Sequence, residues 1–402
     1  MKKQLSVLNK RDKLIQYFRE TAADDAGGMA DAGPGKLALV PSEHNASPLW
    51  RMVCREAQGA PIGEQELLDH ILHVVQRSGY AFPRALIVNY YVSLKTNPFV
   101  ILTGAEGRGK TELARLFAEA LVGRDTPQYT LIPSAGVWPG GTGEDSYYRS
   151  LHERFSSWRF LDLLQEAALP SNIHKAYFVC FDALHPEELE YYFATLLHVD
   201  PNGTKRLNLP GFPADRQLTI PSNMYITATV NMAEHKENLS RNVLRHAGLI
   251  EFRALHWSAE PVGPVTAPAA VPPVGFQRIW LRMALHDVPL ARARLVAILG
   301  EDRYGRLRCS PKLAQLLWRT GLALTKDILQ ELETYIANSF DLQGRGLFDQ
   351  DDVHHNAQIA YDSQVLQRFL WRLRDSPDQE VRRDLAEYLD LVAFGTAQQA
   401  VA

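Results

Sequence analysis

The sequence predicts an α/β fold built on a parallel sheet, followed by a C-terminal part made of helices. Short, almost continuously apolar runs alternate with helix-like segments as far as residue 252, the pattern of a parallel sheet covered on both faces. After residue 276 we find no convincing strand. Between the two parts, PVGPVTAPAAVPPVG at 261–275 cannot continue a helix because prolines interrupt it.

Length and composition narrow the class of protein. The chain has 402 residues, enough for roughly two or three domains. Its net charge of −3 gives no general attraction for nucleic acid or an anionic membrane. Its three scattered cysteines do not form a disulfide framework. No apolar run approaches the ~18 residues of a spanning helix, and the basic N-terminus lacks the apolar stretch of a signal peptide. We therefore expect a soluble, cytoplasmic protein.

Four parts are expected along the chain. They are an N-terminal helical region at 1–82 with a flexible Gly-rich loop at 21–36, an α/β core at 83–255, a Pro-rich linker at 256–276, and a helical C-terminal domain at 277–402. Within the first part, the apolar residues of 64–78 share one helical face. Gly79 takes the place of the glycine that commonly follows a helix.

The strands of the core are expected at its apolar runs. These are PFVILTG at 98–104, QYTLIP at 128–133, AYFVCFD at 176–182, MYITATVN at 224–231 and GLIEF at 248–252. Apolar residues at helical spacing predict a helix over 111–121, directly after the first strand. Cys180 falls inside an apolar run, so we interpret it as a core residue and not as a nucleophile.

One motif carries a specific chemistry. GAEGRGKT at 104–111 matches the phosphate-binding pattern G-x-x-x-x-G-K-[ST] in full, between an apolar strand and a helix. Glycines let backbone N–H groups point at one phosphate, and the helix N-terminus favours negative charge. Lys110 would reach the β- and γ-phosphates, and Thr111 would offer its hydroxyl to Mg²⁺. The predicted binding residues are Gly104, Ala105, Glu106, Gly107, Arg108, Gly109, Lys110, Thr111 and Glu112. ATP is the expected nucleotide.

Two polar residues close apolar strands of the core. Asp182 ends AYFVCFD, and Asn231 ends MYITATVN. In a parallel sheet both would lie at the edge that carries the phosphate-binding loop. There Asp182 would hold Mg²⁺ together with Thr111, and Asn231 would position the attacking water. An ordinary aspartate at the end of a strand is the alternative interpretation of Asp182.

Taken together, about residues 80–255 resemble the core of an AAA+ ATPase of the McrB-like branch. The resemblance rests on SLKTNPFVILTGAEGRGKTELARLFAEAL at 93–121, FDALHPEELEYYFATLL at 181–197 and LTIPSNMYITATVNMAEHKENLSRNVLRHAGLIEF at 218–252. It implies that Asp182 is the Walker B aspartate and that Asn231 is the sensor residue. It also implies that 328–340 and 361–373 are helices of a lid that closes over the nucleotide.

The chain departs from the family where water is activated. The family has a glutamate after the Walker B aspartate, and this chain has Ala183. The asparagine usually found two residues further on is His185. The resemblance therefore implies intact nucleotide binding with weakened hydrolysis. In an alternative, Glu187 or Glu188 of the following helix replaces the missing glutamate.

The arginine-finger motif of the family is altered as well. Its Leu-Asp-Arg ending is replaced by Leu244, Arg245 and His246, so that the arginine lies one residue early. Arg245 is the residue that we expect to act as a finger on a neighbouring subunit. Self-association through the core, or a hetero-complex with an effector subunit, would then complete the site.

Two functions follow from the resemblance. The first is an ATP- or GTP-dependent motor or switch subunit of a prokaryotic DNA-restriction or anti-phage defence complex. The second is a non-hydrolysing nucleotide-binding scaffold subunit. The arginines crowded into 278–319 would contact a nucleic-acid backbone, face a neighbouring subunit, or form a solvated helix surface. His354 and His355 beside Asp351 and Asp352 are interpreted as a solvated loop and not as a metal site.

Overall fold

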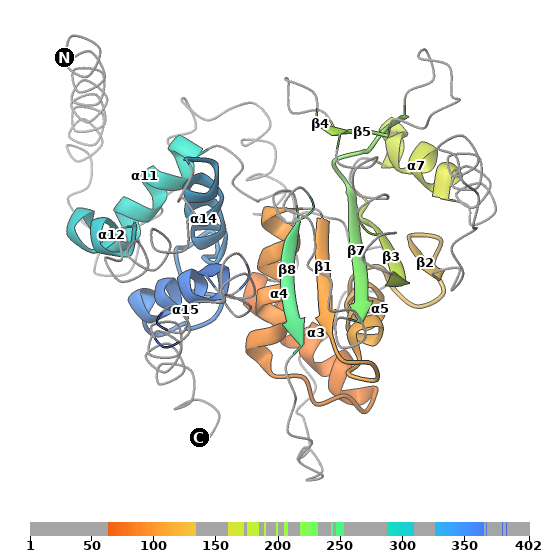
Figure 1. Cartoon of the computed structure of the whole chain (residues 1–402), viewed down its shortest axis with the longest axis horizontal. Helices are drawn as coiled ribbons and strands as arrows, with labels where there is room; N and C mark the ends of the chain where they lie inside the picture. The colour runs from red at the N-terminus through yellow and green to blue at the C-terminus, as the bar shows by residue number, and fades with distance from the viewer. Residues whose placement is uncertain are drawn as a thin grey trace. The chain divides into compact units, whose positions relative to one another are not determined.

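The computed structural model describes residues 63–97, 99–133, 160–172, 175–184, 189, 198–199, 205–207, 218–231, 243, 247–252, 288–308, 326–365, 367, 380 and 383. The loop expected at 21–36 and the linker expected at 256–276 lie outside these residues. Figure 1 shows the course of the chain.

A five-stranded sheet, in which every neighbouring pair of strands is parallel, forms the centre of the core (Figure 1). Its strands are β1 (Phe99–Gly104), β2 (Tyr129–Pro133), β3 (Tyr177–Leu184), β7 (Met224–Asn231) and β8 (Gly248–Phe252). Their spatial order is β2-β3-β7-β1-β8. Each strand coincides with a predicted run to within two residues at either end. The predicted α/β fold with a parallel sheet is confirmed.

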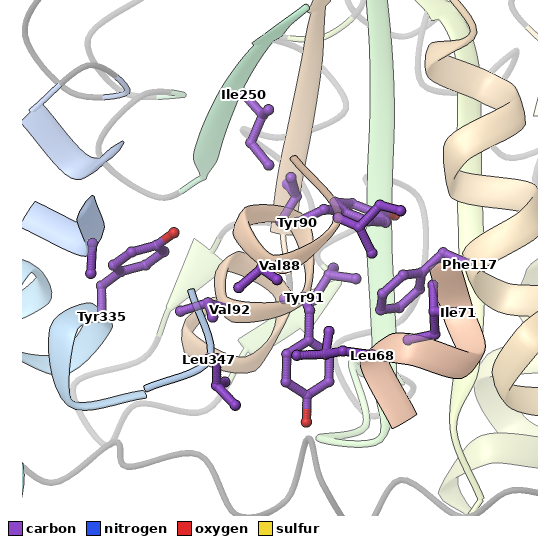
Figure 2. Close-up of a cluster of buried hydrophobic side chains, with 14 of the residues drawn as sticks. Leu68, Ile71, Val88, Tyr90, Tyr91, Val92, Phe117, Ile250, Tyr335 and Leu347 are labelled. Carbon is purple, nitrogen blue, oxygen red and sulfur yellow. The ribbon is translucent and has the colours of Figure 1, made fainter. Parts of the chain in front are cut away.

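Three helices cover one face of the sheet. They are α3 (Glu64–Arg77), α4 (Arg84–Thr96) and α5 (Lys110–Val122). Figure 2 shows Tyr90 and Tyr91 of α4 beside Phe117 of α5, and the Tyr90 and Phe117 ring centroids are 4.8 Å apart. Leu68 and Ile71 of α3 belong to the same apolar core. Packing of these side chains fixes α5, and with it the loop from which α5 begins, against the sheet.

The other face of the sheet is also covered. Helix α7 (Phe160–Ala168) places Phe160 and Leu164 in a second apolar core with Ile101 of β1 and Ile226 of β7. A short 3-10 helix, η1 (Pro170–Asn172), follows α7. Burial on both sides explains why β1, β3 and β7 are apolar at most positions, whereas the edge strand β2 is largely half-buried or exposed.

The structure also contains a small antiparallel sheet that was not predicted from the sequence. Its strands are β4 (His198–Val199), β5 (Lys205–Leu207) and β6 (Leu218–Thr219), in that spatial order. Strands of two or three residues are too short to show the alternation by which a strand is recognised in a sequence.

The described regular elements of the C-terminal part are helices, joined at 339–352 by a non-helical segment. Its helices are α11 (Val288–Leu299), α12 (Glu301–Arg308), α14 (Lys326–Asn338) and α15 (Val353–Val365). Helix α14 agrees with the expected 328–340 to within two residues. The second expected segment, 361–373, overlaps the end of α15, which begins earlier, at Val353, and most of the rest of that segment lies outside the described residues.

An aspartate cap marks the start of α15. The Asp352 carboxylate accepts hydrogen bonds from the N–H groups of His354 and His355, at 2.8 and 3.1 Å. Such a cap satisfies the first N–H groups of a helix and so fixes where it begins. His354 and His355 therefore lie in the first turn of α15, and their interpretation as a loop was wrong. The Nδ1 atom of His355 also lies 2.7 Å from Oδ2 of Asp349.

The helical part is joined to the core through α3 and α4. The Tyr335 hydroxyl of α14 donates to Asn89 Oδ1 of α4 at 2.6 Å. Arg84 Nη1 donates to the carbonyl of Leu347 at 2.8 Å. Helix α4 therefore contacts both the central sheet and α14. In the ranges that the structure describes, no helix combines the length and the apolar character needed to cross a bilayer.

Candidate functional site

The candidate site begins where β1 ends. The chain leaves Gly104 with φ of 141° and enters α5 after Gly109 with φ of 83°. A Cβ at Gly104 would lie 2.6 Å from the carbonyl oxygen of Phe252, and one at Gly109 would lie 2.8 Å from Cζ of Phe82. Both positions therefore require glycine, for the backbone conformation and for space. Gly109 has no side chain to cap α5, so the N-terminus of this helix opens toward the loop.

An aromatic group supports the loop from behind. The ring of Phe82 stacks on Tyr80 at 5.5 Å and meets Phe252 edge-on at 6.0 Å. Phe82 belongs to the link between α3 and α4 and contacts the loop at Gly109. The loop is thus packed against both the sheet and the segment that precedes α4.

Lys110 and Asn231 meet at the carboxyl edge of the sheet. The Lys110 ammonium group donates to the carbonyls of Gly104 and Ala105, at 3.0 and 2.8 Å, and to Asn231 Oδ1 at 2.9 Å. The meeting follows from topology, because Gly104 of β1 pairs with Asn231 of β7 in the sheet. The lysine predicted to bind phosphate and the predicted sensor residue therefore lie in direct contact.

Asp182 lies beside the same loop. Thr111 Oγ1 donates to Asp182 Oδ1 at 2.5 Å. A second hydroxyl, Thr229 Oγ1, donates to the same oxygen at 2.8 Å and accepts the N–H of Ala183 at 2.8 Å. Thr229 is absent from the sequence-based prediction. The signal that could have pointed to it is a polar residue inside an apolar strand, two positions before Asn231.

The backbone changes direction directly after Asp182. Ala183 is exposed and has φ of 53°, a left-handed conformation that residues other than glycine adopt rarely. The register between β3 and β7 shifts at this point. Strained residues of this kind concentrate at functional sites. The residue directly after Asp182 therefore places a methyl group, and no carboxylate, at this edge of the sheet.

The remaining predicted residues play different parts. Glu106 is exposed, and Arg108 is half-buried. Glu112 forms an ion pair with Arg115 of α5, with 2.6 Å between Nη2 and Oε2. Arg245 lies outside the described residues, as do His185, Glu187, Glu188 and His246.

Cys180 has the environment of a core residue, as predicted. The thiol is buried in β3. Burial raises its pKa well above the ordinary value, and the neighbouring Asp182 charge adds to the effect. A thiol held protonated in this way is a poor nucleophile.

The arginines of 278–319 do not form one exposed surface. Arg294 is buried and donates to the carbonyls of Phe340 and Asp341. Arg292 pairs with Glu333 of α14, with 2.7 Å between Nη2 and Oε2. Arg292 therefore joins α11 to α14, and Arg294 joins α11 to the segment that follows α14. Burial excludes a contact with nucleic acid and a solvated surface for Arg294, whereas the Arg292 side chain is 42% exposed. Arg278, Arg282 and Arg319 lie outside the described residues.

The residues of the site fit a nucleotide-bound Mg²⁺ better than a cation held by protein alone. Across the described part of the chain, no cluster of three or more His, Cys, Asp or Glu can hold a metal. Thr111 and Asp182 instead offer one hydroxyl and one carboxylate in contact. Mg²⁺ is typically bound by one or two carboxylates together with substrate phosphates. The strand, glycine loop and helix on a parallel sheet form a P-loop NTPase-like core.

Comparisons with known proteins add little to this geometry. No protein-family model matches the chain, and no curated protein matches it. Among solved structures the chain is similar to a full-length MCM homolog from Methanopyrus kandleri, with a TM-score of 0.33 and 11% identity. The alignment covers 85% of this chain and 63% of that chain, so the protein spans less than two thirds of the matched structure. A similarity with so low a TM-score identifies neither the family of this chain nor its functional site.

Proposed function

We propose that this chain binds a nucleoside triphosphate with Mg²⁺ at the loop 104–111. The proposal is carried by one observation, the convergence of Lys110, Thr111, Asp182 and Asn231. Their side chains come from α5, β3 and β7 and are joined by hydrogen bonds at one edge of the sheet. A lysine, a hydroxyl, a carboxylate and an amide around a glycine-rich helix N-terminus make up the set that binds a Mg²⁺-triphosphate.

Each residue has a role that follows from its atoms. The loop N–H groups and the Lys110 ammonium group would bind the phosphates. Thr111 and Asp182 would hold Mg²⁺, which supplies positive charge against the phosphate oxygens when bound. Asn231, already held by Lys110, would orient a water molecule beside the terminal phosphate.

At a finer level we propose an AAA+ protein of the McrB-like branch. The chain would act as a motor or switch subunit in a DNA-restriction or anti-phage defence complex. Arg245 would complete the site of a neighbouring subunit, and α14 and α15 would belong to the lid. We also propose that the chain is divided into four parts, at 1–82, 83–255, 256–276 and 277–402.

The phosphate dependence of binding tests the proposed function. We expect ATP or GTP with Mg²⁺ to bind the full chain about 100-fold more tightly than the matching nucleoside, because charge-assisted hydrogen bonds to the phosphates dominate. Isothermal titration calorimetry with the triphosphate, the monophosphate and the nucleoside measures this difference. Equal affinity for nucleoside and triphosphate would contradict a site built on this loop.

Ala183 favours a second candidate function, a subunit that binds nucleotide without hydrolysing it. The residue is exposed, carries no carboxylate and follows Asp182 directly. A carboxylate that accepts a proton from water contributes about 10²–10⁴-fold to a rate. Its absence therefore predicts slow turnover by the isolated chain.

Restoring the carboxylate distinguishes the two candidates. Ala183→Glu is expected to raise nucleotide hydrolysis by at least about tenfold, whereas Ala183→Gln, of the same size but without basicity, is expected to leave it unchanged. Both replacements keep a Cβ at a position that already tolerates one at positive φ. Phosphate release, with and without DNA, measures the rate. Fast turnover by the wild-type chain would instead support the motor or switch.

A further inference from the structure

The bulge after Phe181 gives Thr229 an unusual position between two strands. In the ladder between β3 and β7, Phe181 pairs with Ala228, and the next pair is Leu184 with Val230. Two residues of β3, Asp182 and Ala183, therefore stand opposite the single residue Thr229. This is the arrangement of a β-bulge, in which the regular backbone pairing is interrupted.

The Thr229 hydroxyl bridges this interruption. It accepts the Ala183 N–H and donates to Asp182 Oδ1, both at 2.8 Å. A hydroxyl has one proton to donate, and here that proton is directed at the carboxylate. Thr229 is 1% exposed, so water does not compete for these contacts.

The two hydroxyls at Asp182 do not have the same task. Thr111 and Thr229 both donate to Oδ1, while Oδ2 receives no hydrogen bond from the described residues. Thr111 belongs to the phosphate-binding motif, in which this hydroxyl turns to Mg²⁺. Thr229 is buried in a central strand, lies outside that motif and donates to Asp182 Oδ1.

We propose that Thr229 is a positioning residue that fixes the Asp182 carboxylate and thereby sets the Mg²⁺-dependent part of nucleotide affinity. The inference rests on the proposed function, because it concerns the cation of the same site. Groups that orient a metal-binding carboxylate typically change metal affinity by about 10–100-fold when they are removed.

The test compares three full-length variants with the wild-type chain. Thr229→Val removes the hydroxyl and keeps the shape, while Thr229→Ser keeps the hydroxyl. Thr227→Val is the matched control, since Thr227 lies two residues earlier on β7, is 3% exposed, and bonds the Tyr90 hydroxyl at 2.6 Å. Nucleotide Kd is measured in excess Mg²⁺ and in EDTA, together with the Mg²⁺ concentration that gives half of the full effect.

We expect Thr229→Val to raise the Kd in Mg²⁺ by about tenfold, with the Kd in EDTA unchanged. Thr229→Ser should stay within about threefold of wild type in both conditions, since the donor is kept. Thr227→Val should change neither Kd. A purely structural threonine would shift both Kd values alike.

Two failures are distinguished by the same measurements. Wild-type protein that binds no nucleotide in either condition overturns the proposed function. Wild-type protein that binds nucleotide, with Thr229→Val equally sensitive to Mg²⁺, overturns the role of Thr229 alone. If circular dichroism shows that the valine variant is unfolded, Thr229→Ala is measured in its place under the same criteria.

Discussion

Replacing Lys110 with alanine is expected to weaken nucleotide binding by about 100-fold or more. The ammonium group already lies among three oxygen acceptors at the mouth of the loop, in contact with Gly104, Ala105 and Asn231. Hydrogen bonds to a charged partner contribute about 1.5–3 kcal/mol each, and removal of the lysine would cost phosphate at least one of them. A loss of about 2.7 kcal/mol corresponds to the expected 100-fold.

Lys175→Ala is the matched control for this variant. Lys175 is exposed and precedes β3, at the opposite end of this strand from Asp182, so that its removal changes the net charge equally without touching the loop. Calorimetric titration of both variants with MgATP and MgGTP separates a local contact from a general effect of charge. Similar affinities for Lys110→Ala and Lys175→Ala would rule out the loop as the phosphate-binding site.

The loop was predictable because its signal is local. Strand β1, the glycines and α5 are contiguous in sequence, and each glycine requirement arises from a backbone conformation or a close contact of that segment. Asp182 and Asn231 were predictable for a related reason. Each ends an apolar run, and parallel topology brings such ends to one edge.

The role proposed for Thr229 was not predictable in this way. Its contacts with Asp182 and Ala183 depend on where the ladder between β3 and β7 shifts, and no local pattern encodes that shift. The buried contacts of Arg294 escaped prediction because composition alone does not say which arginine faces the carbonyls of Phe340 and Asp341. The start of α15 is marked in the sequence by the capping carboxylate of Asp352.

The largest single effect on folding is expected at a buried ion pair between α3 and α4. Lys95 Nζ lies 2.7 Å from Glu64 Oε1, and the two side chains are 2% and 1% exposed. The Tyr91 hydroxyl donates to the same oxygen at 2.7 Å. Burial lowers the pKa of Lys95, whereas the Glu64 charge opposes that change. Removal of one member of the pair would therefore leave the other charge buried without its countercharge.

Lys95→Met is expected to lower the free energy of unfolding by about 3–5 kcal/mol, because it leaves the Glu64 carboxylate buried without its countercharge. The double variant Glu64→Gln, Lys95→Met is expected to regain at least half of the loss, since it removes both charges together. Chemical denaturation of the full chain, followed by circular dichroism, measures the free energies of unfolding of the wild type, of Glu64→Gln, of Lys95→Met and of the double variant, which together form a double-mutant cycle.

An exposed pair provides the comparison. Arg124 pairs with Glu119 at 3.1 Å, but the arginine side chain is 68% exposed, so Arg124→Ala should cost less than about 1 kcal/mol. Each of Lys95→Met and Arg124→Ala removes one positive charge, so burial is the main difference between them. If Lys95→Met were no more destabilising than Arg124→Ala, the junction of α3 and α4 would not depend on this ion pair. Phe82 lies in the link between α3 and α4 and contacts the loop at Gly109. Its position would then depend on apolar packing alone.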